Sequence, residues 1–222
     1  MFDRCVVLNL DRRPDRWAAF LARIPADWPF PAPERWPAVD GEQAVGIPSW
    51  WRESPGAWGC FQSHLAIWRA QQDAGERWLI LEDDAFAVDN LAERWAKIAA
   101  NVPDNWHQMY LGGQFLELCR VTPQPFDGNP WWVRAFNVNR THAYAVAQEF
   151  LPRLLKFFEK RWNLHVDYAL AKLHRDSTCM IVAPREWLFG QVAGRSDVCV
   201  QGETNRAALA KTMLWQLPEL KE

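Results

Sequence analysis

A run of four apolar residues that leads directly into three acids constrains this chain more than any other feature. Trp78-Leu79-Ile80-Leu81 is followed by Glu82-Asp83-Asp84. A short apolar run bounded by polar residues is typical of a buried strand in a parallel sheet. Such sheets bind their ligands just beyond the carboxyl ends of the strands. The pattern therefore predicts that the three acids lie at a ligand-binding edge.

Two interpretations of the acids are open on local grounds. Three carboxylates beside a core repel one another and call for a cation. A hard divalent ion such as Mg²⁺ or Mn²⁺ accepts oxygen ligands and can be shared with a diphosphate. Alternatively, the acids form a turn that caps the following helix, because negative charge is favoured at helix N-termini.

Composition limits the class of protein. The 222 residues suit one domain with an ample core. A net charge of −2 gives no overall sign of a nucleic-acid binder, although a local basic face stays possible. The five cysteines lack CxxC spacing, which disfavours a disulfide framework and structural zinc. Without a signal peptide or a membrane-spanning apolar run, we expect a reducing, cytoplasmic location.

The beginning of the chain predicts a strand followed by a basic helix start. Residues 5–10 read as a buried strand, and Asp11 follows as an N-cap. Arg12, Arg13 and Arg16 lie at this strand-to-helix turn, where a helix N-terminus and arginines both suit phosphate. A solvated helix face is the alternative for at least one of them.

Three polar residues before the acidic strand are candidates for ligand contact. Asp40 could accept hydrogen bonds from a ribose or a base, or it could belong to an ordinary Asp-Gly turn. Ser63 and His64 lie in the early turns of a helix predicted from Gly59 to Gly75. They could reach a ligand in the sheet cleft, although a single histidine in a helix is more often structural.

The second half of the chain alternates strands and helices. We expect a flexible loop over residues 114–130, a basic helix over 149–162 and a helix opened by Asp167. The basic helix could meet a phosphate-rich acceptor or an anionic membrane, or simply be solvated. Further predictions are a helix capped by Asn90 and Glu93, strands at 106–111 (closed by Gly112-Gly113), 131–136, 141–147 and 178–183, and a last helix at 203–215.

Taken in order, several motifs resemble glycosyltransferase family 25, which includes bacterial lipooligosaccharide galactosyltransferases and collagen galactosyltransferases. The match is strongest over residues 5–88, and weaker similarities are Thr141-His142-Ala143-Tyr144, Val166-Asp167 and Ser196-Asp197-Val198. The stronger motifs are Val6-Val7-Leu8-Asn9-Leu10 with Arg12-Arg13 and Arg16, Ala38-Val39-Asp40-Gly41, Gly59-Cys60 with Ser63-His64, and Leu79-Ile80-Leu81-Glu82-Asp83-Asp84-Ala85.

The resemblance implies a GT-A-like α/β fold with a mostly parallel central sheet flanked by helices. A single domain over residues 1–222 would comprise a nucleotide-sugar-binding half (1–110) and an acceptor-binding half (111–222). The acids would correspond to the family's DxD-type motif. In that reading Asp84 binds Mn²⁺ or Mg²⁺ that bridges the donor diphosphate, and Glu82 supports the metal or the ribose.

The resemblance also assigns further roles. The family is regarded as inverting, usually with a UDP-sugar donor. Inversion by in-line displacement needs a base on the opposite face of the sugar, and carboxylates are the usual choice. The candidates are Asp167, Asp197 and Glu117, of which Asp167 is preferred. The expected metal ligands are Asp84, Glu82 and Asp197, and the expected donor contacts are Asn9, Arg12, Arg16, Asp40, Ser63, His64, Glu82 and Asp83.

The acceptor is open. A lipopolysaccharide, lipooligosaccharide or other lipid-linked surface saccharide leads, with peripheral membrane contact. A phage-type enzyme that glycosylates a hydroxymethylated DNA base is a second option. Trp131-Trp132 and the basic helix around Lys156 allow it, whereas the net charge disfavours it. A third option is a non-catalytic glycan-binding protein on a degenerate fold, against which the intact acid cluster argues.

Overall fold

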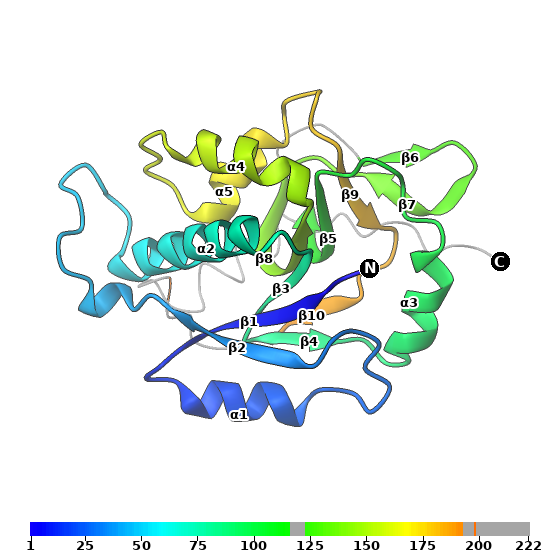
Figure 1. Ribbon diagram of the computed structural model, residues 1–222, viewed down its shortest axis with the longest axis horizontal. Coiled ribbons are helices and arrows are strands. Elements are labelled where there is room, and N and C mark those ends of the chain that lie inside the picture. Colours follow the sequence, from blue (N-terminus) through cyan, green and yellow to red (C-terminus); the bar gives the residue numbers. More distant parts are fainter. Residues whose placement is uncertain (116–122, 193–197, 199–222) are drawn as a thin grey trace.

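The computed structural model of the chain describes residues 1–115, 123–192 and 198. An eight-stranded sheet with the order β2-β1-β3-β8-β5-β9-β7-β6 forms its centre (Figure 1). The strands are β1 (Arg4–Leu10), β2 (Pro33–Ala38), β3 (Trp78–Glu82), β5 (Gln108–Phe115), β6 (Gln124–Phe126), β7 (Asn129–Arg134), β8 (Val138–Val146) and β9 (Ile181–Pro184). A small second sheet pairs β4 (Ala85–Ala87) with β10 (Phe189–Gln191).

The central sheet is mixed in its pairings. β1 is parallel to β2 and β3, and β5 is parallel to β9. β8 runs antiparallel between β3 and β5, and β7 runs antiparallel between β9 and β6. Only β7 and β8 therefore oppose the common direction. The predicted α/β class with a central sheet between helices is confirmed.

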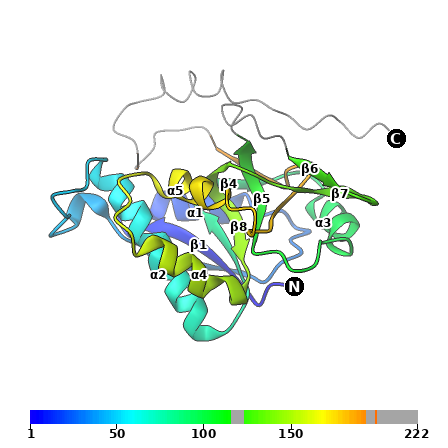
Figure 2. The same cartoon turned by 90° about the horizontal axis from the view of Figure 1, so that it is seen from above.

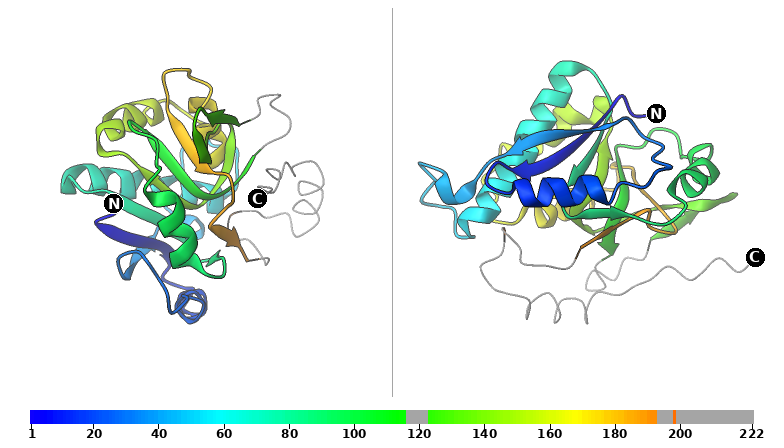
Figure 3. Two further views of the ribbon diagram at one scale, coloured as in Figure 1. Left: turned by 90° about the vertical axis from the view of Figure 1, so that its right-hand side faces the viewer. Right: turned by 90° about the horizontal axis from the view of Figure 1, so that it is seen from below.

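Helices cover both faces of the sheet. α2 (Pro55–Ala74), α4 (Leu151–Phe158) and α5 (Val166–Leu173) pack together on one face, and Figure 2 shows them on the same side. α1 (Pro14–Ala22) lies across β1 and β2 on the opposite face (Figure 3). α3 (Leu91–Ala99) and two short 3-10 helices, η1 (Gly41–Gln43) and η3 (Gln148–Phe150), complete the described part of the fold.

The core follows the apolar runs of the sequence. Leu79, Ile80 and Leu81 of β3 are completely buried, as are Val6 and Val7 of β1. These two strands pair in parallel, so their carboxyl ends reach the same edge of the sheet. The prediction that the acids follow a buried strand is confirmed.

The N-termini of α1 and α2 lie at other residues than predicted, because other residues precede and cap these helices. α1 follows Arg13 rather than Asp11, whose carboxylate pairs with Arg35. α2 begins at Pro55, not Gly59, because Ser54 Oγ accepts a hydrogen bond from the Ala57 amide at 3.0 Å. The segment expected to break the chain is therefore an N-cap with proline at N1. The predicted end of α2 at Gly75 is confirmed, with φ at +69°.

Other boundaries differ as well. Asn90 precedes α3 in a left-handed conformation and makes no side-chain cap, so the predicted capping pair is wrong. β5 continues through Gly112-Gly113 instead of ending there. A Cβ at Gly112 would lie 2.5 Å from His142 Nε2 and 2.7 Å from the Phe189 carbonyl oxygen. Glycine is required at this position because β8 and β10 approach the strand closely.

The segment expected to be a loop over residues 114–130 contains the end of β5, β6 and the start of β7, while residues 116–122 lie outside the described part. The predicted helix at 203–215 also lies outside it. Trp132 of β7 is completely buried and donates a 3.0 Å hydrogen bond to the Ile98 carbonyl, so it is a core residue.

Two of the compositional expectations can be compared with the described part of the chain. Cys5, Cys60 and Cys179 are free thiols there, whereas Cys119 and Cys199 are outside it. Over the same residues, none of the helices combines the length and apolarity that crossing a bilayer requires.

Candidate functional site

A cleft of about 740 Å³ opens where β1 and β3 end. Its walls come from these strand ends, the start of α1, the N-terminal half of α2, and residues of β8, α5 and β10. Two candidates for the base or metal, Glu117 and Asp197, lie outside the described residues. All other predicted site residues line the cleft, namely Asn9, Arg12, Arg16, Asp40, Ser63, His64, Glu82, Asp83, Asp84 and Asp167.

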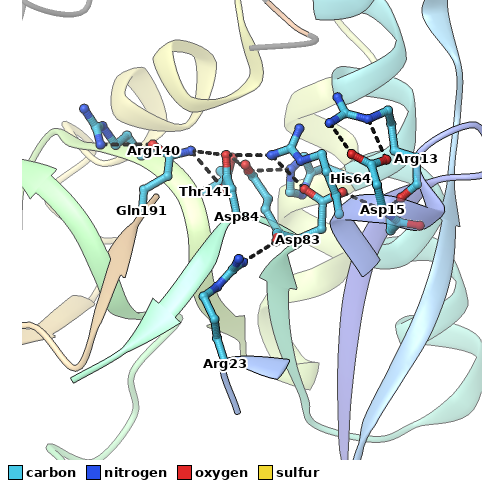
Figure 4. A network of polar contacts seen from close by, with 12 residues as sticks. Arg13, Asp15, Arg23, His64, Asp83, Asp84, Arg140, Thr141 and Gln191 are labelled. Carbon is cyan, nitrogen blue, oxygen red and sulfur yellow. Dashed lines mark hydrogen bonds and ion pairs between the residues drawn. The ribbon is translucent and has the colours of Figure 1, made fainter. Parts of the chain in front are cut away.

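Asp83 fastens the end of β3 to the neighbouring elements. Its carboxylate accepts a 2.7 Å hydrogen bond from Asn9 Nδ2 and forms an ion pair with Arg16 Nη2 at 2.8 Å. Arg23 Nη2 donates to the Asp83 carbonyl oxygen at 3.0 Å (Figure 4). Burial raises the pKa of Asp83, while Arg16 and Asn9 act against that rise. Both oxygens of the Asp83 carboxylate thus have a partner within the protein.

Asp84 is the acid of the cluster that most needs a cation. Arg16 Nη2 lies 3.0 Å from its Oδ2, and Gln191 Nε2 donates to both carboxylate oxygens at 3.2 and 3.1 Å. Gln191 is held in turn by Arg140 Nη1, at 3.0 Å from Gln191 Oε1. Burial and the nearby Glu82 charge raise the pKa of Asp84 to about 6. A positive ligand would therefore stabilise its ionised form.

Glu82 has the opposite character. Burial acts to raise its pKa, but His64, the hydrogen bond from Thr141 and the other neighbours outweigh that effect and lower the pKa to about 2. Thr141 Oγ1 donates to Glu82 Oε1 at 2.6 Å, and His64 Nε2 lies 3.6 Å from the same oxygen. Glu82 is therefore the more readily ionised of the two acids, because its pKa is lowered while that of Asp84 is raised.

Asp40 and Ser63 have structural contacts at the rim of the cleft. Asp40 pairs with Arg12 Nε at 2.8 Å and also caps η1, accepting a hydrogen bond from the Glu42 amide at 3.1 Å. Ser63 Oγ accepts from the Val39 amide at 2.8 Å and donates to the Gly59 carbonyl at 2.7 Å. The bond from the Val39 amide joins the 39–41 turn to α2, and the two bonds of the Ser63 hydroxyl leave it little capacity for a ligand.

Asp167 comes from the other half of the chain and lies in the first turn of α5. Oδ1 accepts a hydrogen bond from the Tyr168 amide at 2.8 Å, and Oδ2 accepts one from the Arg140 amide at 3.1 Å. The residue in the N-cap position is His165. Burial raises the pKa of Asp167, and the two amides oppose that rise. The carboxylate is thus fixed at the cleft wall and is more basic than an ordinary aspartate.

Sequence reasoning missed Arg23, Arg140 and Gln191 as members of this network. Gln191 belongs to a three-residue strand, which is too short for an alternating pattern to reveal. Arg140 has φ at +72° inside β8, near the irregular pairing with β5 around Gly112. Thr141 was named only within a weaker family motif and was given no role in the site, and the strand predicted to begin there starts at Val138.

The donor set suits a shared cation rather than a fully protein-bound one. Within residues 1–115 and 123–192, no three His, Cys, Asp or Glu side chains are grouped to hold a metal by themselves. Mg²⁺ is usually bound through one or two carboxylates together with substrate phosphates. Asp84, with its raised pKa and hard oxygen atoms, fits such an ion, and so does the ionised Glu82.

Comparison with known proteins adds a family. The model of glycosyltransferase family 25, described as an LPS biosynthesis protein, matches residues 52–170, which is just over half of the chain. A solved structure, described as a glycosyltransferase involved in the glycosylation of the major capsid of PBCV-1, has 11% sequence identity and a TM-score of 0.49, over 87% of this chain and 94% of that one. No curated protein matches significantly. The family match, over residues that include Glu82, Asp83, Asp84 and Asp167, shows that the chain belongs to glycosyltransferase family 25.

Proposed function

We propose that this glycosyltransferase is metal-dependent and inverting, and that it moves a hexose from a UDP-sugar to a hydroxyl of a lipopolysaccharide, lipooligosaccharide or other surface glycan. The observation that carries the proposal is that the acids at the end of β3 and the carboxylate of Asp167 line the same cleft. The acids that end β3 line it from the first half of the chain, and Asp167 lines it from the second.

The first half of the chain supplies groups that suit a nucleoside diphosphate. Arg12 and Arg16 line the cleft where α1 begins, and guanidinium groups bind phosphate oxygens in a bidentate manner. Arg16 already neutralises part of the acid cluster, with contacts to Asp83 and Asp84. A diphosphate in this position would attract Arg16 and leave Asp84 to a divalent ion. Asp40 then lies at the rim as a hydrogen-bond acceptor for the ribose.

Asp84 and Glu82 would hold Mn²⁺ or Mg²⁺ together with the donor diphosphate. When bound, such an ion neutralises the charge that accumulates on the leaving diphosphate oxygens. Arg16 contributes to the same neutralisation from its place beside Asp84.

Asp167 is the proposed base. The acceptor hydroxyl gives its proton to the carboxylate as its oxygen bonds to the anomeric carbon, and the bond from that carbon to the diphosphate breaks, releasing UDP. Inversion follows because attack and departure occur on opposite faces. The amides of Arg140 and Tyr168 hold the carboxylate at a fixed point, as in-line attack requires.

The wall around Asp167 suits a saccharide acceptor. Tyr168 follows the base and is 37% exposed, and an exposed aromatic ring offers an apolar surface to the C–H face of a sugar. Glu53 and His165 also line this wall, with His165 Nε2 at 3.5 Å from Glu53 Oε2, and can bond to hydroxyl groups. The division into a donor half (1–110) and an acceptor half (111–222) remains a prediction, and Glu53 is an exception to it, because this residue of the first half lies at the acceptor wall.

A nucleotide-sugar panel tests the proposal. The full chain is incubated with UDP-, GDP- and CMP-sugars, with Mn²⁺ or with EDTA, and with saccharide or hydroxymethylated DNA acceptors. We expect hydrolysis or transfer with a UDP-hexose and Mn²⁺ only, and transfer to saccharide. Activity that is unchanged in EDTA would refute metal dependence. Transfer to DNA, with binding that falls steeply with salt, would identify the phage-type alternative.

A further inference from the structure

A line of three buried side chains leads from the core to Glu82. Trp68 Nε1 of α2 lies 2.9 Å from the hydroxyl of Tyr144 on β8. The same hydroxyl lies 2.7 Å from His64 Nδ1, and His64 Nε2 lies 3.6 Å from Glu82 Oε1. All three side chains are completely buried, so water cannot take the place of any of these contacts.

The donors and acceptors along this line fix where the protons are. The indole N–H of Trp68 can only donate, so the Tyr144 oxygen accepts from it. Burial raises the pKa of Tyr144 well above its ordinary value, so the phenol keeps its proton and must donate it. His64 Nδ1 is the acceptor within reach. Nδ1 therefore carries no proton, and the imidazole proton is on Nε2.

The Nε2 proton points toward Glu82. In the described part of the chain, His64 Nε2 is buried and has no hydrogen-bond partner. An unsatisfied buried donor is unfavourable, so a small approach of the Glu82 carboxylate would stabilise both groups. Thr141 Oγ1 donates to the same Oε1 atom, at 2.6 Å. Both contacts are made to Oε1, which leaves Oε2 available to a ligand in the cleft.

We propose that His64 is a positioning residue for Glu82, with its tautomer set by Tyr144 and Trp68. This role differs from the direct nucleotide contact that the sequence suggested, because the imidazole is completely buried and its two nitrogens face Tyr144 and Glu82. The effect of His64 on nucleotide-sugar binding and transfer rests on the proposed function, in which Glu82 binds the metal ion of the sugar donor. The tautomer of His64 does not depend on that proposed function.

The tautomer can be observed directly by two-bond ¹H–¹⁵N NMR correlation of the five histidines in the ¹⁵N-labelled full chain. The His64 signals are assigned by their absence in His64→Gln. We expect an unprotonated Nδ1 and a protonated Nε2 in the absence of any nucleotide. Tyr144→Phe should weaken this preference because Nδ1 loses its donor. The reverse tautomer in the wild type, or an unchanged tautomer in Tyr144→Phe, would overturn the proposal.

The positioning role is tested by two variants at His64. Gln can place an N–H near the position of Nε2, whereas Leu cannot donate. We expect His64→Leu to lower Mn²⁺-dependent UDP binding and transfer by about 10–100-fold, and His64→Gln to restore part of the loss. Equal activity in the two variants would overturn the role. If the wild type shows no transfer at all, the proposed function fails, while the NMR result still decides the tautomer.

Discussion

The backbone amide of Arg140 donates a 3.1 Å hydrogen bond to Asp167 Oδ2. Arg140 achieves this with a left-handed backbone, φ +72°, which is costly for a residue with a side chain. Its guanidinium meanwhile holds Gln191, which binds Asp84. A single strained residue thus connects the proposed base to the proposed metal ligand.

The strain at Arg140 leads to a stability prediction. Arg140→Ala and Arg140→Gly both remove the guanidinium, but only glycine adopts a positive φ without penalty. We expect Arg140→Gly to be more stable than Arg140→Ala by about 1 kcal/mol. Urea denaturation of the two variants measures the difference. Equal midpoints and slopes would mean that the backbone at this position relaxes in the variants.

Asp84→Asn should remove metal-dependent nucleotide binding. The substitution keeps the size of the side chain but leaves a weak ligand for a hard cation. Calorimetry with UDP, with and without Mn²⁺, should show a large gain from Mn²⁺ in the wild type and little in the variant. Glu186→Gln is the matched control, because Glu186 is an exposed acid paired with Arg94 outside the cleft. Wild-type UDP affinity that is the same with and without Mn²⁺ would contradict the prediction.

The raised pKa of Asp84 predicts a pH dependence of stability in the absence of metal. In the folded chain the pKa is about 6, above the ordinary 3.8, so the native state binds the proton more tightly than the unfolded state does. This group's contribution is complete below about pH 4 and is lost as pH rises through about 6. Asp84→Asn lacks this loss.

The measurement is the melting temperature of both proteins in EDTA from pH 4 to 8. We expect the advantage of Asp84→Asn over the wild type to grow between pH 4 and about 6 and then to level off. An advantage that is constant over this range would show that Asp84 keeps an ordinary pKa in the folded chain.

Site residues could be predicted where the neighbouring sequence marks their position, and could not where distant segments determine it. Arg16 and the three acids were found because they lie at or just beyond the ends of strongly apolar strands, whereas Asn9, inside β1, was expected only from the family resemblance. Parallel β1 and β3 bring these residues together. Asp11 and Asn90 were misjudged as caps because the sequence does not show competing partners. Arg35 takes the Asp11 carboxylate, and Asn90 adopts a left-handed backbone.

Contacts between distant segments were not readable in the same way. Gln191 reaches Asp84 only because β10 pairs with β4, and both strands have only three residues. The mixed character of the sheet also depends on contacts between distant segments, because β8 lies between β3 and β5 and runs antiparallel to both. The nearly continuous burial of β8 is compatible with either strand direction, so the hydrophobic pattern predicts the strand but not its orientation.

Tyr168 should affect the acceptor and not the donor. If its exposed ring stacks against the acceptor sugar, Tyr168→Ala raises the KM for a saccharide acceptor about fivefold, because an aromatic contact contributes on the order of 1 kcal/mol. Tyr168→Phe keeps the ring and should remain close to the wild type. The Kd for UDP is measured in parallel. A change in the Kd for UDP without a change in the KM for the acceptor would show that Tyr168 belongs to the donor site and would contradict the prediction.

Asp167→Asn separates the base from a merely structural aspartate. The carboxylate accepts hydrogen bonds from two amides, Tyr168 and Arg140, whereas an asparagine side chain offers only one oxygen. The variant should therefore lose about 1 kcal/mol of stability in either case. Stability cannot distinguish the roles, but turnover can.

As a base, Asp167 takes the acceptor proton, and Asn cannot. Transfer should then fall by roughly 10²–10⁴-fold, while the Kd for UDP with Mn²⁺ stays near the wild-type value because the donor site is formed by other residues. Assays are run well below the melting temperature of the variant, with Glu186→Gln as the control, because it makes the same kind of acid-to-amide change at an exposed residue outside the cleft. Near-normal kcat in Asp167→Asn would exclude Asp167 from proton transfer, and Asp197 and Glu117 would be the next carboxylates to substitute.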